Sequence, residues 1–337
     1  MLRFNQFVAI SALLTALIIV CSHASALQAS RPTADSWAEF QSQVSAQTDP
    51  AATRAAEFLI AHHPQRDASI DSQLLSENLE FAIKARQSFP WAKSLSEDLF
   101  LNDVLPYAVL DETREHWRPQ LFELSSEIVK GTSNATDAAQ ALNRELFKKV
   151  NVRYSTARAK ANQSPLETMQ SGLASCTGLS ILLVDACRSV GIPARIAGIA
   201  SWMDREGNHA WVEIWDGHQW RFTGAAEYDS NGLDRGWFTG PASLAIKGHE
   251  LHGVWATSWK STGDYFPLVW DLNDRSIPAV DVTSRYAKDH AENSGTHIIA
   301  LRLWASRNGT RIAAPVKMIS VLGVFDSKTF ADPDDIN

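Results

Sequence analysis

The chain contains 337 residues, has a net charge of −7 at neutral pH, and is 45% hydrophobic with 12 tryptophans. An acidic chain without a run of basic residues is poorly suited to bind nucleic acid or an anionic membrane, which excludes both as partners. With only 17 glycines and 13 prolines, the composition is typical of a globular protein of two or three domains.

Residues 1–26 have the pattern of a secretory signal peptide. A single basic residue, Arg3, precedes the apolar run FVAISALLTALIIVC, and the small-x-small motif of a cleavage site ends at Ala26. The run is short for an uncleaved membrane anchor. Val20 is bulky for the residue before a lipoprotein cysteine, which disfavours lipidation of Cys21. We therefore expect a secreted or periplasmic protein that is cleaved near Ala26 and has no membrane span after processing.

Residues 27–150 are predicted to be helical. The stretches SIDSQLLSENLEFAIKA and TDAAQALNRELFKKV repeat hydrophobic residues every three to four positions, as one face of a helix does. The stripes consist of Leu75, Leu79, Ala82 and Ile83 in the first stretch, and of Leu142, Leu146, Phe147 and Val150 in the second.

The stretch SGLASCTGLSILLVDACRSVGIPARIAG predicts one helix with a cysteine near each end. Hydrophobic residues recur at helical spacing from Leu179 to Val190, and the following GIP is a stop signal. At a rise of about 1.5 Å per residue, Cys176 and Cys187 would lie about 16 Å apart along the axis. Because a disulfide needs Cα atoms within about 7 Å, a bond between the two within this helix is excluded.

The two cysteines differ in their predicted surroundings. Cys187 follows Leu179 by eight residues and Leu183 by four, so it lies on the apolar stripe and should be an inert core residue. Cys176 precedes the stripe, at the helix N-terminus, where unpaired N–H groups and the helix dipole favour an anion. We expect this position to lower the thiol pKa and to make Cys176 the nucleophile.

A histidine that could act with this thiol lies downstream in GNHAWVEIWDGHQWRF. Hydrophobic residues alternate from Ala210 to Ile214, which predicts a strand, and the dipeptide DG predicts a tight turn to a second strand. His209 would begin the first strand. An isolated histidine there would ordinarily be structural, but Cys at a helix start followed by His on a strand repeats the arrangement of papain-like thiol enzymes.

At these residues the sequence resembles the transglutaminase-like superfamily. The resemblance rests on ASCTGLSILLVDACRSVGIPARIAG, on NHAWVEIWDGHQWRF and on their spacing, and it covers about residues 165–240. The preceding DLFLNDVLPYAVLDETREHWR resembles the helical lead-in of secreted bacterial members. Members of this superfamily have a papain-like fold and a Cys–His–Asp triad, and they react through a thioester. The resemblance implies that Cys176 is the nucleophile and His209 its acid–base partner.

At the third member of the triad the sequence departs from the family pattern. The family's Asp usually lies four residues after a Trp on the next strand, but counting from Trp220 leads to Gly224. Glu227 and Asp229 follow closely, and either could orient the imidazole of His209, or both could be loop carboxylates in water. We expect Glu227 to have this role, because it is nearer the strand end and has the longer side chain.

Acyl transfer also needs a group that stabilises negative charge on the carbonyl oxygen. Gln170 lies six residues before Cys176, the offset at which papain-like enzymes place a glutamine for this purpose, and the backbone N–H of Cys176 would be a second donor. Alternatively, Gln170 only ends a short helix that begins at Ser164, where Glu167 would complete a capping box.

Two other functions are compatible with parts of the sequence. His249 and His252 in HELH could form a metal pair, but the helical metalloprotease pattern places its histidines four residues apart rather than three. A solvated or packed pair is therefore favoured. The missing Asp also leaves open a transglutaminase-like fold without activity, which would bind a peptide or glycan in a Trp-rich cleft.

Beyond Trp259 the sequence predicts strands in AVDVTSRY, HIIALRLWAS and RIAAPVKMISVLGVF. The sequence therefore predicts an α+β protein with four parts: a signal peptide over 1–26, a helical lead-in over 27–150, a papain-like transglutaminase core over 151–260, and a small β-rich accessory domain over 261–337. We expect a cysteine enzyme that cleaves or transfers acyl groups at amide bonds of a protein or peptide substrate, with no cofactor or metal. Its expected catalytic residues are Cys176, His209, Glu227 and Gln170.

Overall fold

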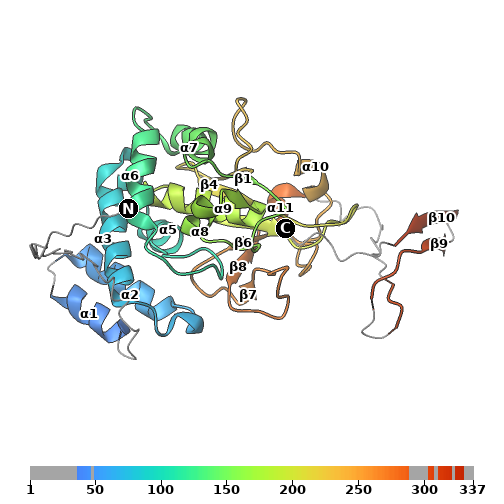
Figure 1. Cartoon of the computed structure of the whole chain (residues 1–337), viewed down its shortest axis with the longest axis horizontal. Helices are drawn as coiled ribbons and strands as arrows, with labels where there is room; N and C mark the ends of the chain where they lie inside the picture. Colours follow the sequence, from blue (N-terminus) through green and yellow to red (C-terminus); the bar gives the residue numbers. More distant parts are fainter. Residues whose placement is uncertain (1–35, 47–48, 288–302, 307–309, 321–322, 330–337) are drawn as a thin grey trace, which may run out of the picture. The chain divides into compact units, whose positions relative to one another are not determined.

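Helices dominate the first half of the chain, and most strands follow them (Figure 1). The computed structural model describes residues 36–46, 49–287, 303–306, 310–320 and 323–329, so the expected signal peptide lies outside the described residues. The helices are α1 (Ser36–Ser45), α2 (Pro50–His62), α3 (Ser72–Ser88), α4 (Pro90–Lys93), α5 (Glu97–Asp103), α6 (Arg118–Ile128), α7 (Ala135–Lys149), α8 (Pro165–Ser171), α9 (Cys176–Ser189), α10 (Thr239–Ala242) and α11 (Thr283–Tyr286). The strands are β1 (Arg153–Tyr154), β2 (Leu173–Ala174), β3 (Ala194–Ile199), β4 (His209–Trp215), β5 (Trp220–Thr223), β6 (Trp255–Thr257), β7 (Asp264–Tyr265), β8 (Pro278–Asp281), β9 (Pro315–Ser320) and β10 (Gly323–Lys328). This order confirms the predicted α+β class with a helical N-terminal region.

The helical region buries the stripes that its sequence predicts. In α3, Leu75, Leu79 and Ala82 are buried, and Asp71 caps the helix by accepting from the backbone N–H of Gln73. In α7 the buried face includes Leu142, Leu146 and Phe147. None of the helices in the described parts of the chain is long and apolar enough to cross a membrane.

Helix α9 is buried along its whole length, because other elements cover every face of it. It packs on β3 and β4 of the central sheet and is covered by α6, α7 and α8. Ser175 caps its start by accepting from the N–H of Gly178, at 3.0 Å. Gly191 ends it with φ +74°, and a Cβ there would lie 2.6 Å from the Cβ of Ala92, so only glycine fits. The predicted helix is thus confirmed, with Cys176 as its first residue.

The central sheet has six strands in the order β5-β4-β3-β6-β8-β7, and every neighbouring pair is antiparallel. The predicted turn between β4 and β5 is present, and Asp216 accepts there from the backbone N–H groups of His218 and Gln219. Strands β7 and β8 lie after residue 260 yet belong to this sheet, so the core sheet extends to Asp281.

The rest of the predicted β-rich segment is described only in part. Strands β9 and β10 pair as an antiparallel hairpin within the predicted stretch RIAAPVKMISVLGVF. Most of HIIALRLWAS lies outside the described residues. A separate accessory domain beyond the core sheet therefore stays a prediction.

Candidate functional site

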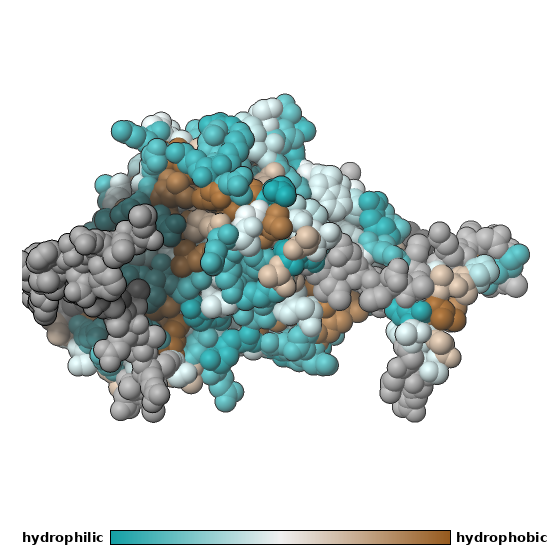
Figure 2. Space-filling model, viewed as in Figure 1, coloured by the Kyte–Doolittle hydropathy of each residue, from teal (hydrophilic) through white to brown (hydrophobic). Residues whose placement is uncertain are grey.

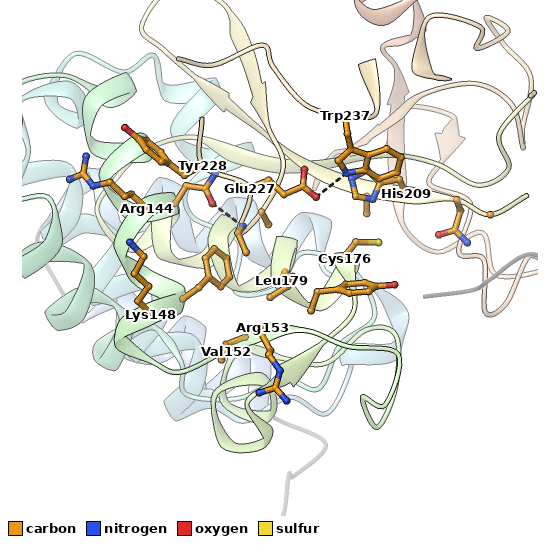
Figure 3. Close-up of a pocket in the computed structure, with 18 of the residues that line it drawn as sticks. Arg144, Lys148, Val152, Arg153, Cys176, Leu179, His209, Glu227, Tyr228 and Trp237 are labelled. Carbon is orange, nitrogen blue, oxygen red and sulfur yellow. Dashed lines mark hydrogen bonds between the residues drawn. The ribbon is translucent and has the colours of Figure 1, made fainter. Parts of the chain in front are cut away.

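A cleft of about 980 Å³ opens at the N-terminus of α9 and is bordered by both Cys176 and His209 (Figure 3). Its walls come from α7, the segment 151–154 that includes β1, the loop before β4, and the residues after β5. Figure 2 shows hydrophobic and hydrophilic surface side by side in this part of the molecule, just below α7. Apolar walls with a few polar groups are typical of ligand-binding clefts.

Cys176 lies in the first turn of α9 and is only 7% exposed. Burial raises the pKa of its thiol to about 11, although hydrogen bonds from the backbone of Ala210 and from Thr177 oppose the increase. The position at the helix start led us to expect a lowered pKa. In the folded protein, desolvation of the sulfur outweighs the helix dipole, so the thiol is protonated at neutral pH.

His209 begins β4 and is surrounded by aromatic rings. The centroids of Trp237, Phe238, Trp211 and Trp202 lie 4.7, 5.0, 5.8 and 6.4 Å from the centre of its imidazole. Burial lowers the pKa of His209 to about 3, so the ring is neutral at physiological pH. Its Nε2 atom is buried and has no hydrogen-bond partner among the described residues.

The thiol and the imidazole therefore border the same cleft as a neutral pair. Figure 3 shows Cys176 directly beside His209 in this view. No hydrogen bond joins the two side chains in the described structure, and Nε2 remains available to another group. Apo forms of thiol enzymes commonly have such loose geometry before a substrate binds.

The carboxylate of Glu227 lies where a side chain at residue 224 would begin if that residue were not glycine. A Cβ built on Gly224 would lie 2.1 Å from Oε2 of Glu227 and 2.6 Å from its Cδ. A turn returns the chain over this glycine: the N–H of Glu227 donates to the carbonyl of Gly224, and Ala226 has φ +62°. The carboxylate thus occupies the space of a side chain at residue 224, although it comes from three residues later.

No direct hydrogen bond joins Glu227 to His209 in the described residues, and a link through one water, which would also meet the expectation, stays a prediction. Oε1 of Glu227 accepts a hydrogen bond of 3.1 Å from Nε1 of Trp237, whose ring packs against the imidazole (Figure 3). The other oxygen, Oε2, is buried and has no partner in the described parts of the chain. Burial raises the pKa of this carboxyl. Among the described residues, Glu227 therefore reaches His209 only through Trp237.

Asn143 and Trp237 are two residues of the site that the sequence analysis missed. Asn143 is buried on α7 and holds the turn that delivers Glu227: Nδ2 donates to Oγ1 of Thr223 and to the carbonyl of Gly224, and Oδ1 accepts from the N–H of Ala226, each at 2.9 Å. Its signal in the sequence was an Asn on the apolar stripe of a predicted helix. Trp237 had no local pattern that could have distinguished it.

Gln170 and Asp229, two residues that the sequence analysis considered for the site, do not line the cleft. Gln170 is exposed near the end of α8 and does not line the cleft. The reason is that Ser164 and Glu167 form the capping box of a short helix, after which Gly172 turns the chain with φ +70°. Asp229 also lies outside this cleft, and its carboxylate accepts from the backbone and side chain of Asn231.

The histidine pair of HELH has structural contacts. The rings of His249 and His252 lie 4.6 Å apart, Nδ1 of His249 accepts from two backbone N–H groups, and Nδ1 of His252 contacts the carbonyl of Ser201. In the described residues, no group of three or more potential ligands is arranged to hold a metal ion.

One comparison with known protein families matches the segment that contains this site. Residues 123–225 match the sequence profile of the transglutaminase-like superfamily, and this segment contains α7, α9, β3, β4, β5, Cys176 and His209. No curated protein matches the chain. Among solved structures, the chain is similar to one described as a "Putative Cysteine Protease" from Cytophaga hutchinsonii, with 22% identity and a TM-score of 0.33, over 43% of this chain and about half (48%) of that one. By this profile match, the region over residues 123–225 is similar to the transglutaminase-like superfamily.

Proposed function

We propose that the protein is a cysteine-dependent enzyme that cleaves or transfers the acyl group of a peptide amide bond. The observation that carries this proposal is the pairing, in one cleft, of a thiol at the start of a buried helix with an imidazole whose Nε2 atom has no other partner. The similarity of residues 123–225 to the transglutaminase-like superfamily, which contains cysteine enzymes, supports it.

The reaction begins from the neutral thiol–imidazole pair. When an amide carbonyl enters the cleft, the sulfur of Cys176 attacks its carbon while Nε2 of His209 takes the thiol proton. The same proton then passes to the departing amine nitrogen, and a thioester to Cys176 remains. Water or a second amine attacks this thioester, giving hydrolysis or acyl transfer.

Negative charge develops on the carbonyl oxygen during this attack. The backbone N–H groups in the first turn of α9 have no intrahelical acceptor, and that of Cys176 is suited to donate to this oxygen. Gln170 lies outside the cleft, so we give it no part in the proposed mechanism.

Glu227 is proposed as a positioning residue rather than a catalytic one. By accepting from Nε1 of Trp237, its carboxylate fixes the indole ring that packs on one side of His209. The imidazole is thereby held with one ring nitrogen available to the thiol. In this arrangement a Trp links the carboxylate to the histidine, a connection that the family's Asp makes directly.

The proposal is tested by trapping the nucleophile. The wild-type chain, Cys176→Ala and Cys187→Ala are each incubated with a peptide that carries an electrophile in place of the scissile amide, and the intact mass is measured. We expect one adduct on the wild type and on Cys187→Ala, and none on Cys176→Ala. An adduct on Cys176→Ala, or none on a folded wild type, would contradict the thiol mechanism.

A second candidate function is a peptide- or glycan-binding module without catalysis. It is favoured by the raised pKa of Cys176 and by the absence of a Cys–His hydrogen bond between the two described side chains. The trapping experiment separates the two functions, because a binding module would retain the peptide reversibly without a mass increase.

We also propose that the chain is exported to the periplasm or the outside of the cell. The support is the sequence pattern of residues 1–26, with its cleavage motif at Ala26. Expression of the full chain in a bacterial host, followed by N-terminal sequencing of the periplasmic fraction, should give a mature protein that begins at Leu27. Retention of Met1 in the cytoplasmic fraction would contradict export.

A further inference from the structure

The cleft has a cationic wall on the side of α7. Arg144 and Lys148 lie four residues apart, so they share one face of that helix, and Arg153 of β1 adds a third cation to the lining. Figure 3 shows Arg144 and Lys148 at one end of the cleft and Cys176 towards the other. We refer to Arg144, Lys148, Arg153 and Tyr228 as the α7 wall.

Two cations of the α7 wall form no ion pair with a described residue, although the charge of Glu145 on the same helix acts on Lys148. Lys148 and Arg153 are exposed, and neither forms an ion pair with a described residue. Arg144 pairs with Glu145 at the surface, where such a pair is screened by water and contributes little. This concentration of positive charge is notable because the chain as a whole has a net charge of −7.

The loop 204–206 contributes a different set of charges to the lining of the cleft. There Arg205 is paired through two nitrogens with Asp204, and the neighbouring Glu206 also lines the cleft. The loop 204–206 therefore carries one cation and two carboxylates, whereas the α7 wall has an excess of cations. A substrate in the cleft therefore meets an excess of positive charge at the α7 wall and not at the loop 204–206.

Aromatic rings accompany the cations. Tyr228 is 37% exposed and lines the cleft, and the guanidinium of Arg144 lies 5.5 Å from the centre of its ring. Tyr154, next to Arg153, is 48% exposed and lines the cleft as well. Exposed aromatic side chains can contact apolar groups of a peptide, while the neighbouring cations can bind a carboxylate of the same peptide.

Interaction with the helix dipole does not by itself explain why Lys148 lines the cleft. Lys148 and Lys149 both lie in the last turn of α7, where either would interact favourably with the helix dipole. Lys149, however, pairs with Glu127 and does not line the cleft, whereas Lys148 does line it and has no such partner. The helix dipole accounts for a Lys at this end, and not for one that faces the cleft unpaired.

We propose that the α7 wall is a subsite for an acidic side chain, so that the preferred substrate is a peptide with Asp or Glu close to the amide bond that Cys176 attacks. The proposal rests on the proposed function, and it names the substrate class of the same cleft. The carboxylate of the peptide is bound by Lys148, on the side of the cleft where Arg144 and Tyr228 also lie, and Arg153 adds positive charge at a separate place in the same lining (Figure 3). Neutral and basic peptides lack this interaction and meet repulsion in the basic case.

The experiment uses three electrophilic peptides that differ at one residue, which is Glu, Gln or Lys, and measures the rate of adduct formation on Cys176. For the wild type we expect the Glu peptide to react about two- to fivefold faster than the Gln peptide for each cation it meets, and the Lys peptide to react slowest. High salt should reduce the preference, because it screens exposed charges.

The matched variants are Lys148→Glu and Lys149→Glu, which change the net charge of the same helix end equally. Lys148→Glu should abolish or reverse the order of the Glu and Lys peptides, with at least a fivefold change in their rate ratio. Lys149→Glu should retain the wild-type order. Equal changes in both variants would mean that only the overall charge matters, which would overturn the subsite.

A small uncharged alkylating reagent, iodoacetamide, separates failure of this proposal from failure of the proposed function. If Cys176 reacts with iodoacetamide and with all three peptides at equal rates, the proposed thiol function is retained and the acidic subsite is wrong.

If no peptide forms an adduct, binding of a fluorescent Glu peptide and its Gln counterpart to Cys176→Ala is measured by anisotropy. Tighter binding of the Glu peptide, lost in Lys148→Glu and retained in Lys149→Glu, supports the subsite without catalysis, and equal binding overturns it.

Discussion

The two ends of α9 contain the same functional group in different surroundings. Cys176 and Cys187 are both buried, with exposed fractions of 7% and 0%, and burial raises the pKa of both thiols. Neither exposure nor pKa direction separates them. What separates them is the space in front of the sulfur, because Cys176 borders the cleft and Cys187 lies in the hydrophobic core between the helices and the sheet.

The polar groups near each end differ in their partners, although both carboxylate oxygens of Asp185, near Cys187, are also buried without a hydrogen bond in the described residues and lie near the charges of Arg188 and Arg118. Towards the C-terminal end, Arg188 donates to the carbonyls of Ala194 and Ala108, and Arg118 donates to backbone carbonyls as well, so these buried cations have fixed structural partners. At the N-terminal end, Nε2 of His209 and Oε2 of Glu227 are buried without a partner among the described residues. Unpartnered buried polar atoms are costly, and in an enzyme they commonly await a substrate.

The largest expected effect comes from exchanging the two cysteines for alanine. Cys176→Ala should lower turnover at least about 1,000-fold, because the nucleophile is removed, while the unfolding free energy changes little. Cys187→Ala should keep turnover and lose on the order of 1 kcal/mol of stability, because it leaves a small cavity in the core. Turnover and urea denaturation of both variants test the contrast, and full turnover in both would end the thiol mechanism.

The next effect concerns Gly224, which the carboxylate of Glu227 overlies. Gly224→Ala places a Cβ in the space of this carboxylate, and the far end of a flexible side chain moves at little cost, so the fold should be retained. With Glu227 displaced from Trp237, turnover should fall about 10- to 100-fold, as is common when a catalytic group is held loosely. Gly240→Ala, where a Cβ would meet open space, is the control and should leave turnover unchanged.

Three further variants test the role of Glu227 more directly. Glu227→Gln keeps an oxygen that can accept from Trp237, so it should retain more activity than Glu227→Ala if positioning is the role of this residue. In Gly224→Asp combined with Glu227→Ala, the carboxylate returns to the fourth residue after Trp220, and part of the lost activity should be recovered. Equal losses in Glu227→Gln and Glu227→Ala would mean that the negative charge matters and the positioning role is wrong.

A smaller effect is expected at Asn143, which holds the turn that carries Glu227. Asn143→Ala removes three hydrogen bonds around Thr223, Gly224 and Ala226, so stability should fall by about 1–3 kcal/mol. If the turn positions the site, kcat should fall severalfold at an unchanged KM. Gln140→Ala is the control, because Gln140 donates to the carbonyl of Asp229 in the same loop. A loss of stability without a change in kcat in Asn143→Ala would restrict Asn143 to a structural role.

The elements that carry the site could be predicted from local patterns. The Ser175 cap, the apolar stripe and the GIP stop define α9, and alternation with a DG turn defines β4 and β5, so the positions of Cys176 and His209 were predictable. The pKa of Cys176 was not predictable, because desolvation depends on what covers the helix start. The helix dipole is visible in sequence, whereas the aromatic and backbone groups that bury the sulfur come from other elements.

Contacts across the fold explain the other differences. Gln170 has the right offset from Cys176, but an offset in sequence does not fix direction once a capping box, a helix end and a left-handed Gly172 intervene. Glu227 was predicted at the site, whereas its bond to Trp237 joins residues ten apart across a loop and has no periodic signal. Strands β7 and β8 joined the core sheet although a boundary was expected at residue 260, because pairing with β6 is non-local.

The last expected effect concerns folding stability rather than turnover, and it depends on pH through His209. Burial lowers the pKa of His209 to about 3 in the folded protein, while an unfolded chain has a histidine pKa near 6.5. Between these values the unfolded state binds one more proton than the folded state, so folding stability falls as the pH decreases through this window. This histidine should contribute a slope of about 1.4 kcal/mol per pH unit between about pH 6 and pH 4. His209→Gln removes the ionisable group, so the difference in unfolding free energy between the two proteins, measured by urea denaturation at several pH values, should change with that slope. A constant difference would mean that the imidazole is accessible to protons in the folded protein, and the aromatic enclosure that distinguishes this end of α9 would then be wrong.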